Sequence, residues 1–302
     1  MSKPSPVQPT QADSPEHGQA RINELEAREV LWRRVLRNRR VQLGGGIVLI
    51  TVIVALLASH IAPYDPNKLL GMPLLPPSPA HLLGTDDFGR DEFSRLLYGA
   101  RVSLAVSALS IALAAVIGIP LGLLAGYYRG TTETIIMRAA DVVLSFPTIV
   151  LAIAVVGILG PSFRDLVLVI GVVYAPPFIR VVYGSTLRER QEEYVQAAQA
   201  IGARDAYVLF RVVLPNVMAP VLVQGSLGLG LAVLIEAGLS FLGLGTQPPT
   251  ASWGAMVAVS RNFLTRQPLL LIWPSIAVSL LVLAFNTLGD GLRDVLDPRL
   301  KT

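Results

Sequence analysis

The sequence predicts an all-α integral membrane protein with six transmembrane helices. Of the 302 residues, 52% are hydrophobic and only 15% are charged, whereas about a quarter of the residues in soluble domains are charged. Six apolar runs, each of roughly 18 residues or more, are long enough to cross a hydrocarbon core of about 30 Å. They cover residues 44–61, 102–127, 139–159, 166–183, 217–242 and 269–288.

The segments before the first span differ in character. Residues 1–20 are rich in Pro, Ser and Gln, which predicts a disordered tail. Residues 21–42 combine arginines with Leu25, Trp32 and Leu36, which predicts a basic amphipathic helix at the membrane surface. An arm that binds nucleic acid is the alternative, but this segment directly precedes an apolar span. That first span begins too late and is too long for a cleavable signal peptide, so residues 43–302 form one six-helix transmembrane domain.

The distribution of Lys and Arg predicts the orientation. Segments 1–42, 128–138, 184–216 and 290–302 together carry 17 of these residues, and segments 64–100, 160–165 and 243–268 carry 6. Without the first segment the ratio is still 9 to 6. Because positively charged loops stay in the cytoplasm, both termini are expected there.

Ionisable residues are rare within the spans. Asp141 and Arg180 lie near span ends, and Arg180 is expected to extend toward the cytoplasmic interface. Glu236 is the one deep carboxylate, and it either lines a path through the membrane or bonds to a neighbouring helix. A carrier coupled to protons or sodium normally needs several such groups, so the sequence disfavours that class.

Glycine and proline mark special positions in two spans. Gly118, Gly122 and Gly126 form a stripe of small residues, which suits a close helix contact with either a partner subunit or this chain's own helices. Pro120 and the pair Pro176-Pro177 are expected to kink their helices.

The loop over residues 184–216 predicts a helix–turn–helix in the cytoplasm. Tyr194, Ala197, Ala198 and Ile201 share one helical face, and Gly202 interrupts the pattern. Asp205 is expected to cap a second helix that runs to Pro215. A face of alanines suits docking into a groove on another protein, although it could also pack against this chain's own helices.

Several chemistries lack the residues they require. There is no cysteine, and the three histidines are scattered. No Gly-x4-Gly-Lys-Ser/Thr pattern for ATP binding occurs, and no Ser–His pair, zinc motif or paired aspartates of an intramembrane protease is visible. Asp86, Asp87, Asp91 and Glu92 do not follow the calcium-loop spacing, so we expect a solvated loop or the start of a helix there. The sequence therefore predicts no enzyme and no bound cofactor or metal.

The same cytoplasmic loop carries a family resemblance, on Gln196, Ala197, Ala198, Gly202, Val212, Leu214 and Pro215. These residues resemble the EAA signature of binding-protein-dependent ABC importer permeases: Glu-Ala-Ala, three residues, Gly, nine residues, an aliphatic residue, one residue, Leu-Pro. Every spacing matches. Gln196 departs from the usual Glu and Val212 from Ile, so an ion pair from position 196 is in doubt while the docking geometry is not.

Three further stretches, Gly84–Asp91, Leu239–Pro249 followed by Trp253-Gly254, and Gly289–Pro298, resemble the second permease subunit of the dipeptide, oligopeptide and nickel branch. The resemblance covers residues 30–302. It implies the type I permease fold in a bacterial inner membrane and import of small peptides, with glutathione or nickel as alternatives. The implied partners are a second permease subunit, two ATPases that bind ATP and magnesium, and a solute-binding protein that faces segments 64–100 and 243–268.

The resemblance also assigns a role to individual residues. It places Ala197, Ala198 and Gly202 on a coupling helix that docks into an ATPase, and Gln196, Ile201, Leu214 and Pro215 belong to the same motif region. A stand-alone channel or carrier is the alternative from another class, and such a protein would have no evident use for this loop.

Overall fold

The computed structural model describes residues 33–296, and within this range the chain is almost entirely helical, without a β-strand. The all-α prediction is therefore confirmed. In chain order the elements are α2 (Arg39–Ile61), α3 (Glu92–Tyr128), α4 (Gly130–Leu144), α5 (Thr148–Leu159), α6 (Phe163–Val173), α7 (Ala175–Glu189), α8 (Glu193–Ala200), α9 (Asp205–Tyr207), a π-helix (Val208–Val213), α10 (Leu214–Phe241), α11 (Trp253–Ser260), a 3₁₀ turn (Arg261–Phe263) and α12 (Leu269–Leu296).

The predicted tail over residues 1–20 lies outside the described residues, as does most of the predicted interfacial helix over 21–42. Of that helix, residues 33–37 are helical, and Asn38 then separates them from α2. The Asn38 side chain accepts hydrogen bonds from the backbone N–H groups of Arg40 (2.8 Å) and Val41 (3.3 Å). Asn38 is thus a side-chain N-cap, and the first span starts within the predicted basic segment.

Five helical stretches in the described residues are long and apolar enough to cross a membrane: α2, α3, α6 with α7, α9 through α10, and α12. The remaining predicted span, which is the third along the chain and covers residues 139–159, is not one straight helix. It divides into α4 and α5, which meet at an angle of 86°. Pro147 explains the break, because it lacks an N–H and disfavours helical geometry at Phe146. The chain has six spans when this bent pair counts as one.

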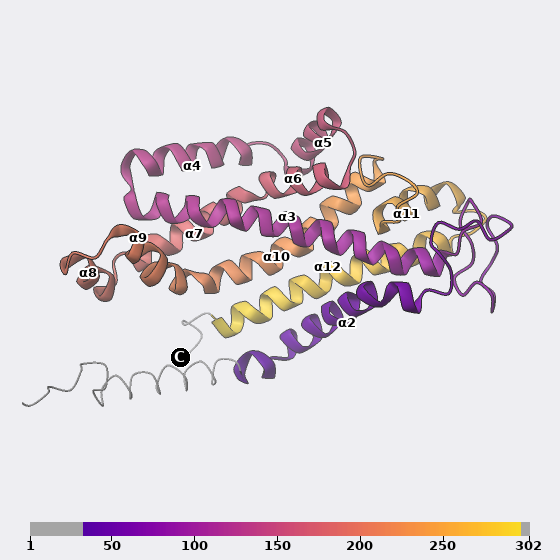
Figure 1. Cartoon of the computed structure of the whole chain (residues 1–302), viewed down its shortest axis with the longest axis horizontal. Helices are drawn as coiled ribbons and strands as arrows, with labels where there is room; N and C mark the ends of the chain where they lie inside the picture. The colour runs from indigo at the N-terminus through magenta and orange to yellow at the C-terminus, as the bar shows by residue number, and fades with distance from the viewer. Residues whose placement is uncertain (1–32, 297–302) are drawn as a thin grey trace, which may run out of the picture.

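Helix α3 is the centre of the bundle. It runs through the middle of the molecule, with α2 and α12 along one side and α4 on the other (Figure 1), and it packs against α7, α6, α10 and α2. α8 projects from one end, here called the α8 end. The segments 62–91 and 242–268, with α11, form the opposite end, here called the far end (Figure 1).

The glycine stripe of α3 packs within this chain, which settles the choice that the sequence left open. A β-carbon at Gly118, Gly122 or Gly126 would lie 2.4 to 2.6 Å from the β-carbon of Phe178, Val182 or Thr186 of α7, respectively. Only glycine allows the two helices to approach so closely. A kink was expected at Pro176-Pro177, and the structure has a boundary between two helices there: α6 ends at Val173 and the two prolines lie in the first turn of α7. Pro120 lies inside the continuous helix α3.

Candidate functional site

The loop at the α8 end forms a short helical hairpin. α8 runs over Glu193–Ala200, Ile201 is its C-cap, and Gly202 follows with a φ of +80°. The N–H of Ala203 donates to the carbonyl of Ala198 (3.1 Å), and that of Gly202 donates to Gln199 (3.0 Å). This pair of bonds is a Schellman motif, which needs a left-handed residue at the position of Gly202. The predicted turn at Gly202 is therefore present, and the structure supplies its physical reason, the left-handed φ of Gly202.

The two faces of α8 have different environments. Val195 has an exposed fraction of 0%, and with the half-buried Ala198 it attaches the helix to the core. On the other face Gln196 and Ala197 are exposed, and the Ile201 side chain beyond the end of α8 is 85% exposed. Exposure of so much aliphatic surface to water is unfavourable and is typical of a surface that contacts a partner. The alanine face therefore does not pack entirely against this chain's own helices.

The return arm of the hairpin differs from the prediction in two details. Asp205 was expected to cap the second helix, but it is the first residue of α9, and its carboxylate accepts a hydrogen bond from the Tyr127 hydroxyl instead. Pro215 was expected to end that helix, yet it is the second residue of α10, which directly follows the π-helix. The π-helix over Val208–Val213 already interrupts the regular bonding just before this point, so the missing N–H of Pro215 costs less there. Leu214 is half-buried against the core.

Hydrogen bonds from Tyr194 connect α8 to both neighbouring helices. Its hydroxyl donates to the Glu189 carboxylate at the end of α7 and accepts from the Asn216 amide of α10 at 3.0 Å. Burial and the bond to Glu189 raise the pKa of Tyr194, so the phenol stays protonated as the donor. These contacts, and those of Tyr127, could not be read from the spacing of the motif, since the partners lie on other helices.

The far end contains a buried network of charges. The Asp86 carboxylate contacts the guanidinium groups of Arg90 (2.6 Å) and Arg95 (3.3 Å), and Asp91, with an exposed fraction of 0%, is the N-cap of α3. The prediction was a solvated loop or the start of a helix, and the start of a helix is what the structure shows. Burial, with the neighbouring Asp86 carboxylate, raises the pKa of Asp87. Among residues 33–296 no group of carboxylates and histidines could hold a metal ion.

The two long segments of the far end are joined to each other. Arg95 donates to the carbonyl of Pro66 at 3.0 Å, and the Gln267 amide donates to the carbonyl of Leu75 at 2.9 Å. The indole of Trp253 donates to the carbonyl of Leu96 in the first turns of α3 at 2.9 Å. Segments 62–91 and 242–268 therefore form one surface held by α3, rather than two separate loops.

Glu236 lies in the interior of the bundle, with an exposed fraction of 0%. Its carboxylate accepts hydrogen bonds from the hydroxyls of Ser103 on α3 (3.0 Å) and Ser240 one turn along α10 (2.8 Å). The bond to Ser103 is the contact with a neighbouring helix that was one of the two predicted environments, and a role of Glu236 in the path stays a prediction. Buried carboxylates are tolerated where hydroxyl donors replace water.

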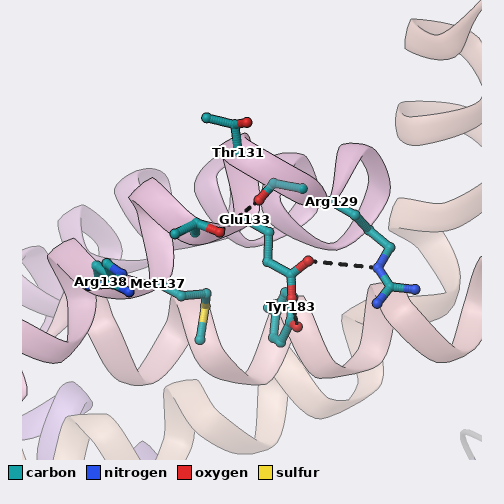
Figure 2. Close-up of a pocket in the computed structure, with 8 residues that line it drawn as sticks. Arg129, Thr131, Glu133, Met137, Arg138 and Tyr183 are labelled. Atoms are coloured by element: carbon teal, nitrogen blue, oxygen red, sulfur yellow. Dashed lines mark hydrogen bonds and ion pairs between the residues drawn. The ribbon is translucent and has the colours of Figure 1, made fainter.

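An open cavity of about 990 Å³ lies between α4 and α7. Figure 2 shows Glu133 at its centre, with Arg129 and Tyr183 directed toward the same carboxylate. The Arg129–Glu133 ion pair is 3.7 Å long, and the Tyr183 hydroxyl donates to Glu133. Arg180, which was expected to extend toward the interface, pairs with Asp141 of α4 at 2.6 Å, and both side chains are exposed. These contacts tie α4 to α7.

Comparisons with known proteins agree with this architecture. Residues 118–302 match the family described as binding-protein-dependent transport system inner membrane component. Residues 28–77 match the N-terminal TM domain of oligopeptide transport permease C. The inward-facing MetNI methionine ABC transporter has the same fold, with a TM-score of 0.55 and 20% identity over 67% of this chain and 96% of that chain.

Two relatives are similar over nearly their whole length. The glutathione transport system permease protein GsiD of Pectobacterium atrosepticum is 45% identical, over 90% of this chain and 91% of the relative. The dipeptide transport system permease protein DppC of Alkalihalophilus pseudofirmus is 43% identical, over 85% of this chain and 86% of the relative. The all-helical bundle, the hairpin with its glycine turn and these matches together show that the chain belongs to the family of binding-protein-dependent transport system inner membrane components, which are transport permeases rather than enzymes.

Proposed function

We propose that this chain is one permease subunit of an ATP-driven importer and forms half of the path by which small peptides enter the cell. The names of the relatives support peptides as the cargo, because the dipeptide and glutathione systems both transport short chains of amino acids. Nickel, the third cargo of the resembling branch, is the alternative within the same machinery. A stand-alone carrier or channel is the alternative from another class.

The observation that carries the proposal is the exposed face of α8. Ala197 and Ile201 are open to solvent, while the buried Val195 holds the same segment to the bundle. A small apolar surface on a firmly attached helix fits a groove on a partner. We assign Gln196, Ala197, Ala198, Ile201 and Gly202 to the contact with an ATPase subunit, and Leu214 and Pro215 to the arm that returns from it.

The remaining parts of the importer follow from this assignment. A second permease subunit completes the path, two ATPase subunits bind ATP and magnesium, and a solute-binding protein delivers the cargo. The excess of Lys and Arg in the segments on the α8 side supports a cytoplasmic location for that end and for both termini. The far end, with its joined surface, then faces the binding protein outside a bacterial inner membrane.

Peptide uptake by reconstituted vesicles tests the proposal. Proteoliposomes would contain this chain with the second permease subunit and the ATPases of its own system, with the binding protein added outside. We expect ATP-dependent uptake of a labelled dipeptide, and competition by unlabelled dipeptide, glutathione and nickel would rank the cargoes. Gly202→Asp should abolish uptake mainly because it places a charge beside the apolar docking face; the backbone cost is small, since aspartate is among the residues that tolerate a φ of +80°.

Two controls are needed to interpret the result: a matched variant, and a preparation that contains this chain without the ATPases. Ala206→Asp adds the same charge at another exposed residue of the loop, where the backbone is helical, and it should retain more uptake than Gly202→Asp. Equal uptake by wild type and Gly202→Asp would contradict the coupling role. Undiminished uptake by this chain alone, without ATPases, would overturn the importer proposal in favour of a carrier or channel.

A further inference from the structure

Tyr127, the penultimate residue of α3, joins that helix to both arms of the hairpin. The side chain is 5% exposed. Its hydroxyl donates to the Asp205 carboxylate at 2.9 Å and accepts a hydrogen bond from the Gln199 amide at 3.1 Å. Gln199 precedes the turn at Gly202 and Asp205 follows it, so one phenol bridges the two arms on either side of the turn.

The ring of Tyr127 has a further contact. The guanidinium carbon of Arg190, just after α7, lies 5.7 Å from the ring centroid, a distance at which a cation interacts favourably with an aromatic face. The phenol therefore meets groups from the end of α7, from α8 and from the start of α9. Since neither arm of the hairpin is adjacent to α3 in sequence, these bonds supply a connection that the chain itself does not.

Helix α3 is well placed to receive movement from the hairpin. Gly126 precedes Tyr127, and a β-carbon there would lie 2.6 Å from the β-carbon of Thr186 and 3.0 Å from the carbonyl oxygen of Tyr183 on α7. Two helices in such direct contact leave little free volume between them. A displacement of the Tyr127 ring therefore moves the helix pair, because the interface has no space in which to absorb it.

We propose that Tyr127 is a positioning residue that transmits movement of the coupling helix α8 to α3, in addition to the covalent connections of α8 to α7 and α10. This inference rests on the proposed docking of α8 to an ATPase. The family resemblance assigns the docking segment alone and gives no role to the end of α3. In this arrangement the two hydrogen bonds of the Tyr127 hydroxyl, here called the Tyr127 bridge, hold the turn at a fixed position relative to α3 while the ATPases close.

The test uses Tyr127→Phe in the assembled importer with its binding protein. Phenylalanine keeps the buried ring and removes both hydrogen bonds. We expect the amount of peptide transported per ATP hydrolysed to fall by roughly 5-fold or more, the usual scale of coupling between sites, with assembly and ATP hydrolysis in the absence of binding protein retained. Tyr183→Phe is the matched control, since it removes a phenol–carboxylate bond between α7 and α4 that does not involve the hairpin.

A distance measurement separates transmission from simple stabilisation. The chain contains no cysteine, so spin labels can be placed at Leu124→Cys on α3 and Ala206→Cys on the return arm. We expect their separation to stay constant between the nucleotide-free and nucleotide-trapped importer in the wild-type background, and to change in the Tyr127→Phe background. A purely structural role would leave both separations constant.

Each outcome is decisive. A wild-type ratio of transport to hydrolysis in Tyr127→Phe, or equal losses in Tyr127→Phe and Tyr183→Phe, overturns the inference. If Tyr127→Phe fails to assemble, Gln199→Ala and Asp205→Ala remove the two halves of the bridge from the exposed side, and unchanged ratios in both overturn it equally. Retained uptake in Gly202→Asp would instead contradict the docking proposal itself, so the two failures are distinguishable.

Discussion

Gly122→Ala should separate α3 from α7. The added β-carbon would lie 2.6 Å from the β-carbon of Val182 and 2.8 Å from the carbonyl oxygen of Ile179, whereas ordinary contacts begin at 3.4 Å. Neither atom can rotate away, so the backbones must move apart by a large part of an ångström. Overpacking of this kind costs about 1–3 kcal/mol. Alanine also has a higher helix propensity than glycine, by roughly 1 kcal/mol, which offsets part of the cost.

Gly184→Ala in α7 removes the propensity effect from the comparison. A β-carbon at Gly184 meets no atom within 4 Å, so this variant gains helix propensity without a clash. The thermal midpoint of each purified variant can be measured as the temperature at which heating removes its monodisperse peak in size-exclusion chromatography. The midpoint of Gly122→Ala should lie roughly 2 to 12 °C below that of Gly184→Ala if 1 kcal/mol corresponds to about 2–4 °C. Equal midpoints for Gly122→Ala and Gly184→Ala would refute the reasoning from close packing.

Three further predictions concern other parts of the molecule. Gly202→Asn should retain more peptide uptake than Gly202→Val, because asparagine tolerates a φ of +80° and a β-branched residue does not; equal uptake would contradict a requirement for left-handed geometry. Ser103→Ala removes a donor from the buried Glu236 carboxylate and should lower stability by about 1–3 kcal/mol in thermal unfolding, and an unchanged midpoint would indicate that Ser240 suffices. In vesicles of known orientation, an impermeant maleimide should label Met72→Cys and Ile201→Cys, both highly exposed in the subunit, from opposite sides of the membrane; labelling from the same side would contradict the predicted topology.

The features that follow from local sequence were predictable. The lengths of the apolar runs predicted the helical spans, because crossing a bilayer sets a minimum length that needs no knowledge of partners. Gly202 predicted the turn after α8, since a left-handed C-terminal position strongly favours glycine. The bend of 86° within the span predicted over residues 139–159 was not predicted, because the apolar length of the run gives no weight to Pro147 inside it.

Features that depend on distant residues could not be predicted. The burial of the Asp86 carboxylate was not predicted, because it depends on the guanidinium of Arg95, which contacts Asp86 and also donates to the carbonyl of Pro66. The contacts of Tyr127 could not be predicted because it lies at the end of an apolar span, where aromatic residues with a polar tip are common. Its partners, Gln199 and Asp205, are more than 70 positions away, and only the folded hairpin brings them to it.

The single helix α3 has a mechanical consequence. It contains 37 residues, and at 1.5 Å per residue it is about 55 Å long. One of its ends, at Asp91, belongs to the buried charges of the far end, and Tyr127 at the other holds the hairpin. A continuous rod of this length acts as a lever: a tilt of about 10° around its midpoint would displace its two ends by roughly 5 Å in opposite directions. A small rotation of α3 in the membrane would thus move the hairpin at the α8 end and the buried charges at the far end at the same time.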